Sequence, residues 1–374
     1  MIKSIKIIYI ISSSHIAGTE IHLLNLIKKI KKIKKFKIEV ICTGGELEKR
    51  IKEIGIKTKK IPMRNKYDIK SLFLIYKYIN NEDFDIVHTH LGISSLLGRI
   101  AAKLSGVSKI IMTEHLWSDF NEDMNYLVNK IHLFIYFLLA KFTTDKIIAV
   151  SEAVKSFLVN EAWVSKNKVK VIYNGVEVKK NKTYNFKKNK FIDKYNINKK
   201  DFLIGIIGRL SAEKGHKYLF EAIKKNKNNN FKLLVIGEGK LENELKEYAN
   251  KENIEDKIIF TGFIDDIDLI YSLIDLIILP SVRECLPMVL LEAMNYEIPA
   301  IASNVGGVSE VIKEGENGLL VEPKNVEEIN EALNFFLENS NKIKRMGKNG
   351  KLILINKFSE EEMIQKTVDI YLDI

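Results

Sequence analysis

Residues 275–294 read DLIILPSVRECLPMVLLEAM, and this stretch decides the fold class. Its first half is a short apolar β-strand ending at Pro280, and its second half is a helix whose first turn suits Pro287. Glu284 lies in the loop between them and Glu292 on the helix. Helix N-termini attract phosphate, and paired carboxylates suit sugar hydroxyls as hydrogen-bond acceptors. The stretch predicts a strand–loop–helix unit with an anion site, although an ordinary capping glutamate would give the same pattern.

The alternation of strand and helix patterns continues along the whole chain. Short β-branched runs predict strands, and amphipathic segments between them predict helices. The predicted strands are residues 5–11, 37–43, 85–90, 109–115, 145–151, 169–175, 201–208, 231–237, 257–263, 275–281, 300–304 and 318–323. A Glu- and Lys-rich segment follows the second strand. Such alternation predicts an α/β fold with parallel sheets made of βαβ units.

The pattern lapses between residues 176 and 200, where lysine and asparagine dominate. We place the domain boundary there, so that residues 1–180 form an N-terminal Rossmann-like domain and residues 181–358 a C-terminal one. A helix at residues 359–374 is expected to pack back on the first domain. Ligands of open α/β sheets bind beyond the carboxyl ends of the strands. The site is therefore expected in a central cleft that both sheets face.

Composition excludes several classes of protein. Of the 374 residues, 46% are hydrophobic and 29% charged, which excludes disorder, collagen and coiled coil. Two cysteines, Cys42 and Cys285, cannot form a disulfide framework or a CxxC zinc site, so a cytoplasmic location is expected. The apolar run at residues 131–140 is about half of the roughly 20 residues that a membrane span needs.

Charge is distributed unevenly. Residues 1–180 carry 31 Lys and Arg against 17 Asp and Glu, whereas residues 181–374 carry 28 against 31. The densest run is KKIKKIKKFK at residues 28–37. A basic face can bind nucleic acid or anionic lipid, or can simply be solvated. No nucleic-acid-binding fold signature accompanies the charge, so we expect no nucleic-acid partner.

The apolar segment at residues 126–142 contains Phe134, Tyr136 and Phe137. One interpretation is an amphipathic helix that dips into a membrane interface. The other, which we favour, is a buried core helix. The first interpretation would make peripheral association with an anionic membrane part of the function.

Further candidate residues follow other predicted strands. In IIGRLSAEKGHKYL at residues 206–219, Arg209 and Lys214 could together neutralise a diphosphate, although surface cations are usually only solvated. In SSSHIAGTEIHLL at residues 12–24, Gly18 lets a phosphate or sugar approach the backbone at a helix start.

Histidines end two predicted strands, His90 in DIVHTH and His115 in IMTEH. Strand ends face the ligand cleft in α/β sheets, but a structural histidine is the commoner outcome for either one alone. The DDID at residues 265–268 contains D-x-D, yet it lies at a helix start where acidic residues favour the macrodipole. We therefore expect no metal site there. Neither GxGxxG nor GxxxxGK[ST] occurs, which disfavours dinucleotide and P-loop interpretations.

Taken in order, these motifs resemble those of retaining family-four glycosyltransferases (glycosyl transferases group 1) with the GT-B fold. The E-x7-E from Glu284 to Glu292 is similar to the donor-site motif of that family, and the resemblance covers nearly the whole chain. The matching motifs are AGTE, DIVHTH, TEH, IIAVSEAVKSFL, VIYNGVE, IIGRLSAEKG, LLVIGEG, IIFTGF, the glutamate motif and SNVGGVSEVIKEGENGLLVEP.

The resemblance implies roles for the donor site. Arg209 and Lys214 would hold the donor diphosphate and stabilise its leaving charge. Glu292 would accept hydrogen bonds from the ribose, and Glu284 from the transferred sugar. The donor is a UDP- or GDP-linked sugar in this family, and no cofactor or metal is implied. Backbone N–H groups around the loop–helix segment of Leu286, Pro287, Met288 and Val289 would complete the anion site.

In the N-terminal half, the resemblance implies that Gly18 approaches the donor phosphate or acceptor and that His115 lines the sugar. His115 would count with Arg209, Lys214 and Glu284 as catalytic. The basic half would bind a saccharide or lipid-linked acceptor at the inner face of the membrane. The implied activity is hexosyl transfer with retention of configuration, in bacterial polysaccharide or lipopolysaccharide biosynthesis.

Three positions depart from the family pattern: Ala17 where glycine is common, Cys285 where glycine often follows the first glutamate, and Glu177 where aspartate is frequent. The alternatives are a GT-B sugar-nucleotide epimerase or phosphorylase, and a non-catalytic nucleotide-sugar-binding partner subunit. The setting of the E-x7-E motif disfavours the epimerase. The chain is short for a phosphorylase, which disfavours that alternative. Loss of catalysis is disfavoured because Arg209, Lys214, Glu284 and Glu292 are all intact.

Overall fold

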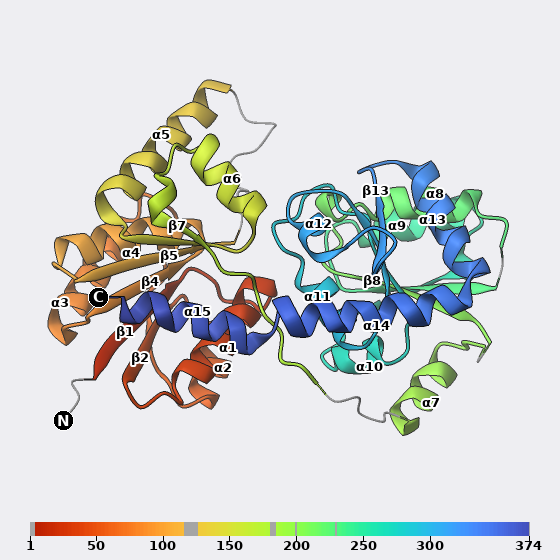
Figure 1. Ribbon diagram of the computed structural model, residues 1–374, viewed down its shortest axis with the longest axis horizontal. Coiled ribbons are helices and arrows are strands. Elements are labelled where there is room, and N and C mark those ends of the chain that lie inside the picture. The colour runs from red at the N-terminus through yellow and green to blue at the C-terminus, as the bar shows by residue number, and fades with distance from the viewer. Residues whose placement is uncertain (1–3, 116–125, 180–184, 199, 229, 374) are drawn as a thin grey trace. The chain divides into compact units, whose positions relative to one another are not determined.

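The computed structural model describes residues 4–115, 126–179, 185–198, 200–228 and 230–373. These divide into two compact units (Figure 1). Unit 1 contains residues 1–175 and 360–374, and unit 2 contains residues 176–359. Each has one parallel sheet with helices on its faces, which makes both units Rossmann-like and confirms the predicted α/β class.

Unit 1 contains a seven-stranded sheet in the order β3-β2-β1-β4-β5-β6-β7. Its strands are β1 (Ile5–Ile11), β2 (Phe36–Cys42), β3 (Lys57–Lys60), β4 (Ile86–His90), β5 (Lys109–Glu114), β6 (Lys146–Ala149) and β7 (Val169–Val171). Its helices are α1 (Gly18–Ile30), α2 (Gly45–Glu53), α3 (Ile69–Glu82), α4 (Gly92–Leu104), α5 (Tyr126–Thr143), α6 (Glu152–Asn160) and α15 (Glu360–Leu372).

Unit 2 contains a six-stranded sheet in the order β10-β9-β8-β11-β12-β13. Its strands are β8 (Phe202–Ile207), β9 (Phe231–Ile236), β10 (Ile258–Gly262), β11 (Leu276–Leu279), β12 (Ala300–Ser303) and β13 (Gly318–Val321). Its helices are α7 (Asn185–Lys194), α8 (His216–Lys225), α9 (Glu242–Lys251), α10 (Ile267–Tyr271), α11 (Met288–Asn295), α12 (Val308–Val311), α13 (Val326–Glu338) and α14 (Ser340–Lys357).

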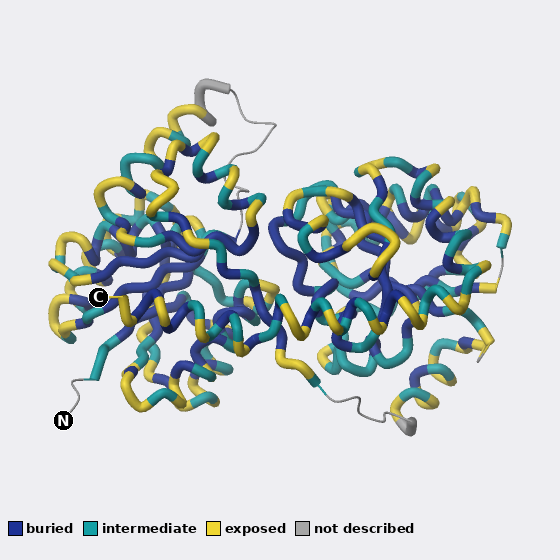
Figure 2. Tube along the Cα trace, viewed as in Figure 1, coloured by how far each residue is buried: buried dark blue, intermediate teal, exposed yellow. Residues whose placement is uncertain are grey.

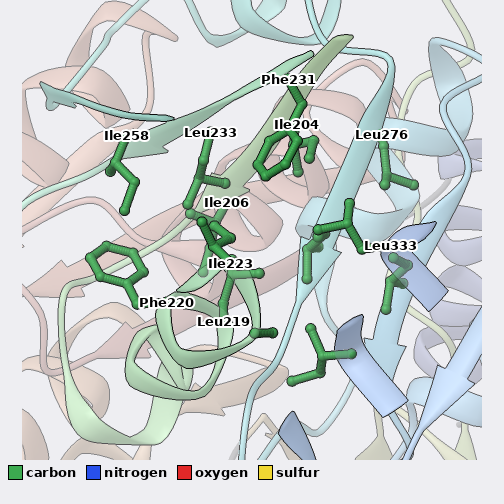
Figure 3. Packing of buried hydrophobic residues seen from close by; sticks show 14 of the residues in the cluster. Ile204, Ile206, Leu219, Phe220, Ile223, Phe231, Leu233, Ile258, Leu276 and Leu333 are labelled. Atoms are coloured by element: carbon green, nitrogen blue, oxygen red, sulfur yellow. The ribbon is translucent and has the colours of Figure 1, made fainter. Parts of the chain in front are cut away.

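Strand β1 shows why these sequences form buried parallel strands. Residues 7–11 are fully buried (Figure 2), because side chains on alternate positions enter two different cores. Ile7 and Tyr9 belong to the core on one face of the sheet, and Ile8 and Ile10 to the core on the other. Unit 2 has a buried hydrophobic cluster of its own, which includes Ile204 and Leu233 from the strands and Phe220 from α8 (Figure 3).

Helix α15, the last segment of the chain, packs on unit 1 beside α1 (Figure 1). The phenol of Tyr371 lies between the Tyr9 hydroxyl at 2.8 Å and Nδ1 of His88 at 2.6 Å. The Lys109 ammonium donates to the carbonyl of Ile370 at 2.5 Å. These buried polar contacts attach the C-terminal helix to the central strands of the sheet.

Two local expectations were wrong. Strand β3 has the sequence KTKK, and sequence analysis missed it because a lysine-rich edge strand lacks the apolar alternation by which strands are recognised. The core-helix interpretation of residues 126–142 is also wrong for the part whose side chains are described. From residue 130 to 143 only Ala140 is buried, and Ile131 and Phe134 are more than half exposed. Among the described residues, no helix is long and apolar enough to cross a membrane.

Candidate active site

The strand order of unit 2 determines where its polar loops meet. Strand β8 lies between β9 and β11, and all three are parallel, so their carboxyl ends share one edge of the sheet. From β8 the chain adds β9 and β10 on one side of the sheet, and it then returns to add β11 on the other side of β8. Open α/β sheets bind ligands at such a change in strand order. Residues 208–215 follow β8 and residues 280–287 follow β11.

Backbone contacts join these two loops directly. The N–H of Val282 donates to the carbonyl of Glu213 at 2.8 Å. Gly215 has a φ of +69°, and a Cβ placed on it would lie 1.9 Å from the carbonyl oxygen of Pro280. Only glycine fits a left-handed position with this close approach. The loops are therefore held together independently of their charged side chains.

Lys214 and Glu284 meet across this junction. The Lys214 ammonium lies 2.6 Å from Oε1 of Glu284, and the hydroxyl of Ser281 donates to the same oxygen at 2.7 Å. The side chains of Lys214 and Glu284 are 27% and 10% exposed. Sequence analysis predicted the two charged residues but not Ser281. The only feature of the sequence that indicates Ser281 is its position directly after Pro280, where the strand ends.

Arg209 follows β8 on the same loop as Lys214, and it is exposed. Within the described part of the chain, its guanidinium has no hydrogen-bond or ion-pair partner. One cation of this loop is thus paired with a carboxylate and the other is available to an anion. A diphosphate is the kind of group that a guanidinium fork and an ammonium bind together.

Glu292 lies on α11, as predicted, and its carboxylate accepts a hydrogen bond from the Tyr271 hydroxyl at 2.6 Å. Burial raises the pKa of Glu292, while the hydrogen bond from Tyr271 opposes that rise. Burial, followed by the neighbouring Glu292 charge, holds the pKa of Tyr271 well above its usual value. Nothing in the sequence indicated Tyr271, because it comes from α10 and meets Glu292 only through tertiary packing.

The segment between Glu284 and Glu292 includes the start of α11. Leu286, Pro287 and Met288 are buried and Val289 is half-buried. Pro287 has extended backbone and stands at the N-cap position, so α11 begins at Met288. The first amides of a helix have no acceptor within the helix, and they carry its partial positive charge. The predicted anion site is therefore available from the backbone.

The two candidates from the N-terminal half lie in unit 1. Gly18 is exposed and begins α1, where the preceding N–H of Ala17 donates to Oε2 of Glu20 at 2.9 Å. His115 directly follows β5 and is buried, with Nε2 sharing a hydrogen bond of 3.0 Å with Nδ1 of His90. The structure thus brings Lys214 and Glu284 into contact in unit 2, and His115 and His90 into contact in unit 1.

The DDID segment lies at α10, as predicted at a helix start. Asp268 pairs with Lys179 at 2.6 Å and Asp266 with Lys187 at 2.5 Å. Both aspartates therefore have lysine partners within unit 2.

Comparisons with known proteins define the class of protein to which this site belongs. Residues 187–353 match the family described as glycosyl transferases group 1, and residues 16–180 match glycosyltransferase family 4. The chain is 30% identical over 312 residues to an Escherichia coli UDP-Gal:alpha-D-GlcNAc-diphosphoundecaprenol alpha-1,3-galactosyltransferase, covering 82% of this chain and 80% of that one. It therefore belongs to glycosyltransferase family 4, and it is a glycosyltransferase.

Another relative agrees with this assignment, and solved structures show the fold. The Staphylococcus aureus capsular polysaccharide biosynthesis glycosyltransferase CapM is 28% identical, covering 88% of this chain and 87% of the relative. The crystal structure of Anabaena HepE in complex with UDP superposes with a TM-score of 0.86 at 20% identity, covering 99% of this chain and 100% of that one. The apo lipopolysaccharide outer core galactosyltransferase WaaB gives a TM-score of 0.75 at 23% identity, covering 99% and 100%. The predicted GT-B fold is confirmed.

Proposed function

We propose that this enzyme transfers a hexosyl group from a nucleoside-diphosphate sugar to a hydroxyl of a saccharide or lipid-linked acceptor, with retention of configuration, in bacterial cell-surface polysaccharide or lipopolysaccharide biosynthesis. The observation that carries the proposal is the junction of two loops that brings Lys214 into contact with Glu284, with the exposed Arg209 on the same loop as Lys214. UDP is the first donor nucleotide to test, because the galactosyltransferase relative is named for a UDP-linked donor. Its named acceptor is a diphosphoundecaprenol-linked sugar, which supports a lipid-linked acceptor here.

The donor site is assigned residue by residue. Arg209 and Lys214 bind the diphosphate, and the backbone N–H groups of Leu286, Met288 and Val289 around the start of α11 assist them. Glu292 binds the ribose hydroxyls. Its half-buried carboxylate is a strong acceptor when ionised, and Tyr271 holds it in position.

Glu284 binds a hydroxyl of the transferred sugar. Its Oε1 atom already accepts from Lys214 and Ser281. A carboxylate has about four lone-pair positions, so Oε2 can accept a sugar hydroxyl without displacing either partner.

The reaction breaks the bond between the anomeric carbon and an oxygen of the β-phosphate. The acceptor oxygen forms its new bond to the anomeric carbon on the same face, and the acceptor proton passes to the departing phosphate oxygen. Negative charge grows on the diphosphate during this step. Fixed cations at that position lower the barrier, and one well-placed donor of this kind typically contributes about 3 kcal/mol.

In unit 1, Gly18 is assigned to the donor phosphate or the acceptor, and His115 is assigned to the transferred sugar. Gly18 offers an uncovered backbone at the start of α1. His115 presents its backbone and ring at the end of β5. The proposed transfer needs no metal and no cofactor, since Arg209 and Lys214 supply the positive charge.

A peripheral membrane surface is part of the proposal. On α3, Ile69 and Phe73 are 78% and 61% exposed, and on α5, Ile131 and Phe134 are 57% and 53% exposed. The Lys66 ammonium donates to Nε2 of His132 at 2.8 Å, so the loop before α3 contacts α5. Exposed apolar side chains interspersed with lysines are typical of surfaces that bind anionic lipid.

Vesicle sedimentation tests this surface. The protein should sediment with phosphatidylglycerol vesicles at low salt and less so at high salt. Phe134→Ser should weaken binding, whereas Phe263→Ser, which changes an exposed phenylalanine of unit 2, should not. Equal binding of both variants would remove the assignment of this surface.

Nucleoside-diphosphate release tests the transferase itself. Purified protein is incubated with UDP-, GDP- and ADP-sugars, with detergent-extracted bacterial lipids as acceptors. Lipid-dependent release is expected from wild type with one donor, and Arg209→Ala and Glu292→Ala should each abolish most of it. Donor binding without any turnover would instead support a non-catalytic partner subunit, and conversion of the donor sugar without an acceptor would support an epimerase.

A further inference from the structure

Four histidines converge inside unit 1 at the carboxyl ends of its central strands. His88 and His90 lie on β4, His115 follows β5, and His22 lies on α1. All four are buried, and none is more than 6% exposed. The rings form a continuous set, with centroid separations of 4.5 Å between His88 and His90 and 4.8 Å between His22 and His115.

Hydrogen bonds divide these histidines into two groups. His88 has a partner at each ring nitrogen, the Tyr371 hydroxyl at 2.6 Å and the Thr113 hydroxyl at 2.7 Å. Nδ1 of His22 and Nε2 of His90 are buried without any hydrogen-bond partner in the described part of the chain. Buried polar atoms nearly always have a partner, so two such nitrogens in one cluster point to a ligand.

The three histidines other than His88 are close enough to share that ligand. One ring nitrogen from each of His22, His90 and His115 can be chosen so that all three lie within 4.8 Å of one another. Tetrahedral zinc with imidazole ligands requires nitrogens about 3.4 Å apart, from a metal–nitrogen distance of about 2.1 Å. Side-chain rotations that move each nitrogen by about an ångström would bring the three nitrogens to this spacing, and water is the usual fourth ligand of a three-histidine site.

We propose that His22, His90 and His115 bind a divalent transition-metal ion, through one ring nitrogen each. Imidazole suits zinc and its neighbours in the first transition row, whereas magnesium and calcium require oxygen ligands. The group of three contains no carboxylate. Its ligands come from α1, β4 and the end of β5, so a bound ion would join three elements of unit 1.

The proposed ion shares His115 with the residues assigned to the sugar, but none of the residues assigned to the diphosphate in unit 2. The residues assigned to the diphosphate, Arg209 and Lys214, belong to unit 2, and the proposed ion belongs to unit 1. When a ring nitrogen of His115 binds the ion, the backbone of His115 is still available to a sugar. The ion would fix the His115 ring in place of the shared hydrogen bond with His90.

Cobalt titration tests the proposal without any measurement of turnover. The full chain is treated with a chelator, exchanged into metal-free buffer and titrated with Co²⁺, whose visible d–d absorption is intense only in four-coordinate sites. One equivalent should produce that absorption, and Zn²⁺ should displace it. Failure to develop the absorption in the wild-type chain would overturn the proposal, and would leave the transferase assignment untouched.

Variants locate the ion. His22→Leu should weaken binding by about 100-fold or more, because even residues outside the ligand set contribute roughly 10- to 100-fold in metal sites. His132→Leu, which changes a histidine of α5 in the same unit, should bind as wild type does. Unchanged affinity in His22→Leu would overturn the site. Should that variant fail to fold by tryptophan fluorescence, His22→Asn provides the same comparison.

Discussion

The ammonium of Lys214 and the carboxylate of Glu284 lie 2.6 Å apart, although 70 residues separate them in the chain. The contact exists because the loops after β8 and β11 are joined through their backbones, at Val282 with Glu213 and at Gly215 with Pro280. A cation assigned to phosphate and a carboxylate assigned to a sugar are thereby presented together before any donor arrives. Several outcomes of mutation can be derived from this arrangement.

Loss of Lys214 should affect activity far more than stability. Partly exposed ion pairs contribute about 1 kcal/mol or less to folding, whereas a cation at a developing charge contributes several-fold more to the transition state. Lys214→Met should therefore keep a near wild-type Tm and lose roughly 100-fold in kcat. Lys246→Met is the matched control, because Lys246 pairs with Glu242 at the same 2.6 Å on the surface of unit 2. Equal kinetics in the two variants would contradict the assignment of Lys214.

Gly215→Ala should destabilise unit 2. The added Cβ would meet the Pro280 carbonyl oxygen at 1.9 Å, and the backbone would also be strained at φ +69°. We expect a loss of about 3 kcal/mol or more, compared with about 1 kcal/mol for backbone strain alone. Gly315→Ala isolates the strain, since Gly315 has φ +70° and nothing within 4 Å of the added Cβ.

Urea unfolding followed by circular dichroism measures both glycine variants. Trp117 and Trp163 are the two tryptophans of the chain and precede residue 176, so their fluorescence reports only on the N-terminal half. The fluorescence transition should be unaltered in both variants. If Gly215→Ala and Gly315→Ala lowered the free energy of unfolding by similar amounts, the close approach to Pro280 would contribute nothing to the cost of Gly215→Ala.

Acidification should destabilise unit 2 through His216. Burial, with a smaller contribution from the Lys214 charge, lowers the pKa of this histidine from 6.5 to about 4. The unfolded chain then binds the proton more readily than the folded one, so stability present above pH 6.5 is lost as the pH falls toward 4. Between pH 7 and pH 5 this amounts to about 2 kcal/mol.

Replacement of His216 removes that loss. His216→Leu should lose less stability than wild type when urea unfolding at pH 7 is compared with unfolding at pH 5. His15→Leu changes an exposed histidine and should retain the wild-type pH dependence. A parallel fall in wild type and His216→Leu would mean that other groups cause the acid sensitivity.

Tyr271→Phe should shift the pH profile of the enzyme. The tyrosine hydroxyl donates to the ionised Glu292 and so favours its charged form; without it the pKa of Glu292 rises further above its usual value. The acid limb of the kcat/KM profile should move to higher pH, with a roughly 10-fold increase in the KM for the donor from the weaker ribose contact.

Tyr248→Phe is the control for this shift. Tyr248 is a tyrosine of α9 in the same unit that packs against Phe220 rather than against Glu292. Its pH profile should match that of wild type. An unmoved acid limb in Tyr271→Phe would exclude Glu292 as the group whose ionisation supports donor binding.

Much of this protein could be predicted from local sequence. β-Branched runs alternating with amphipathic segments were sufficient for the α/β class, because burial on both faces of a parallel sheet requires such runs. The local strand–loop–helix pattern was likewise sufficient to place Glu284 in a loop and Glu292 on a helix. Strand β3 was missed, since the KTKK edge strand satisfies its backbone in a sheet without burying side chains.

Tertiary structure alone decided which side chains meet. Tyr271 reaches Glu292, and Tyr371 reaches His88, through the packing of elements that are 21 and 283 residues apart. The exposure of α5 was likewise undecidable from its apolar sequence, because burial depends on what packs against a helix and not on the helix itself. Sequence determines which chemical groups are present and their local conformation, whereas contacts among distant groups arise only when the sheets form and bring strand ends to one edge.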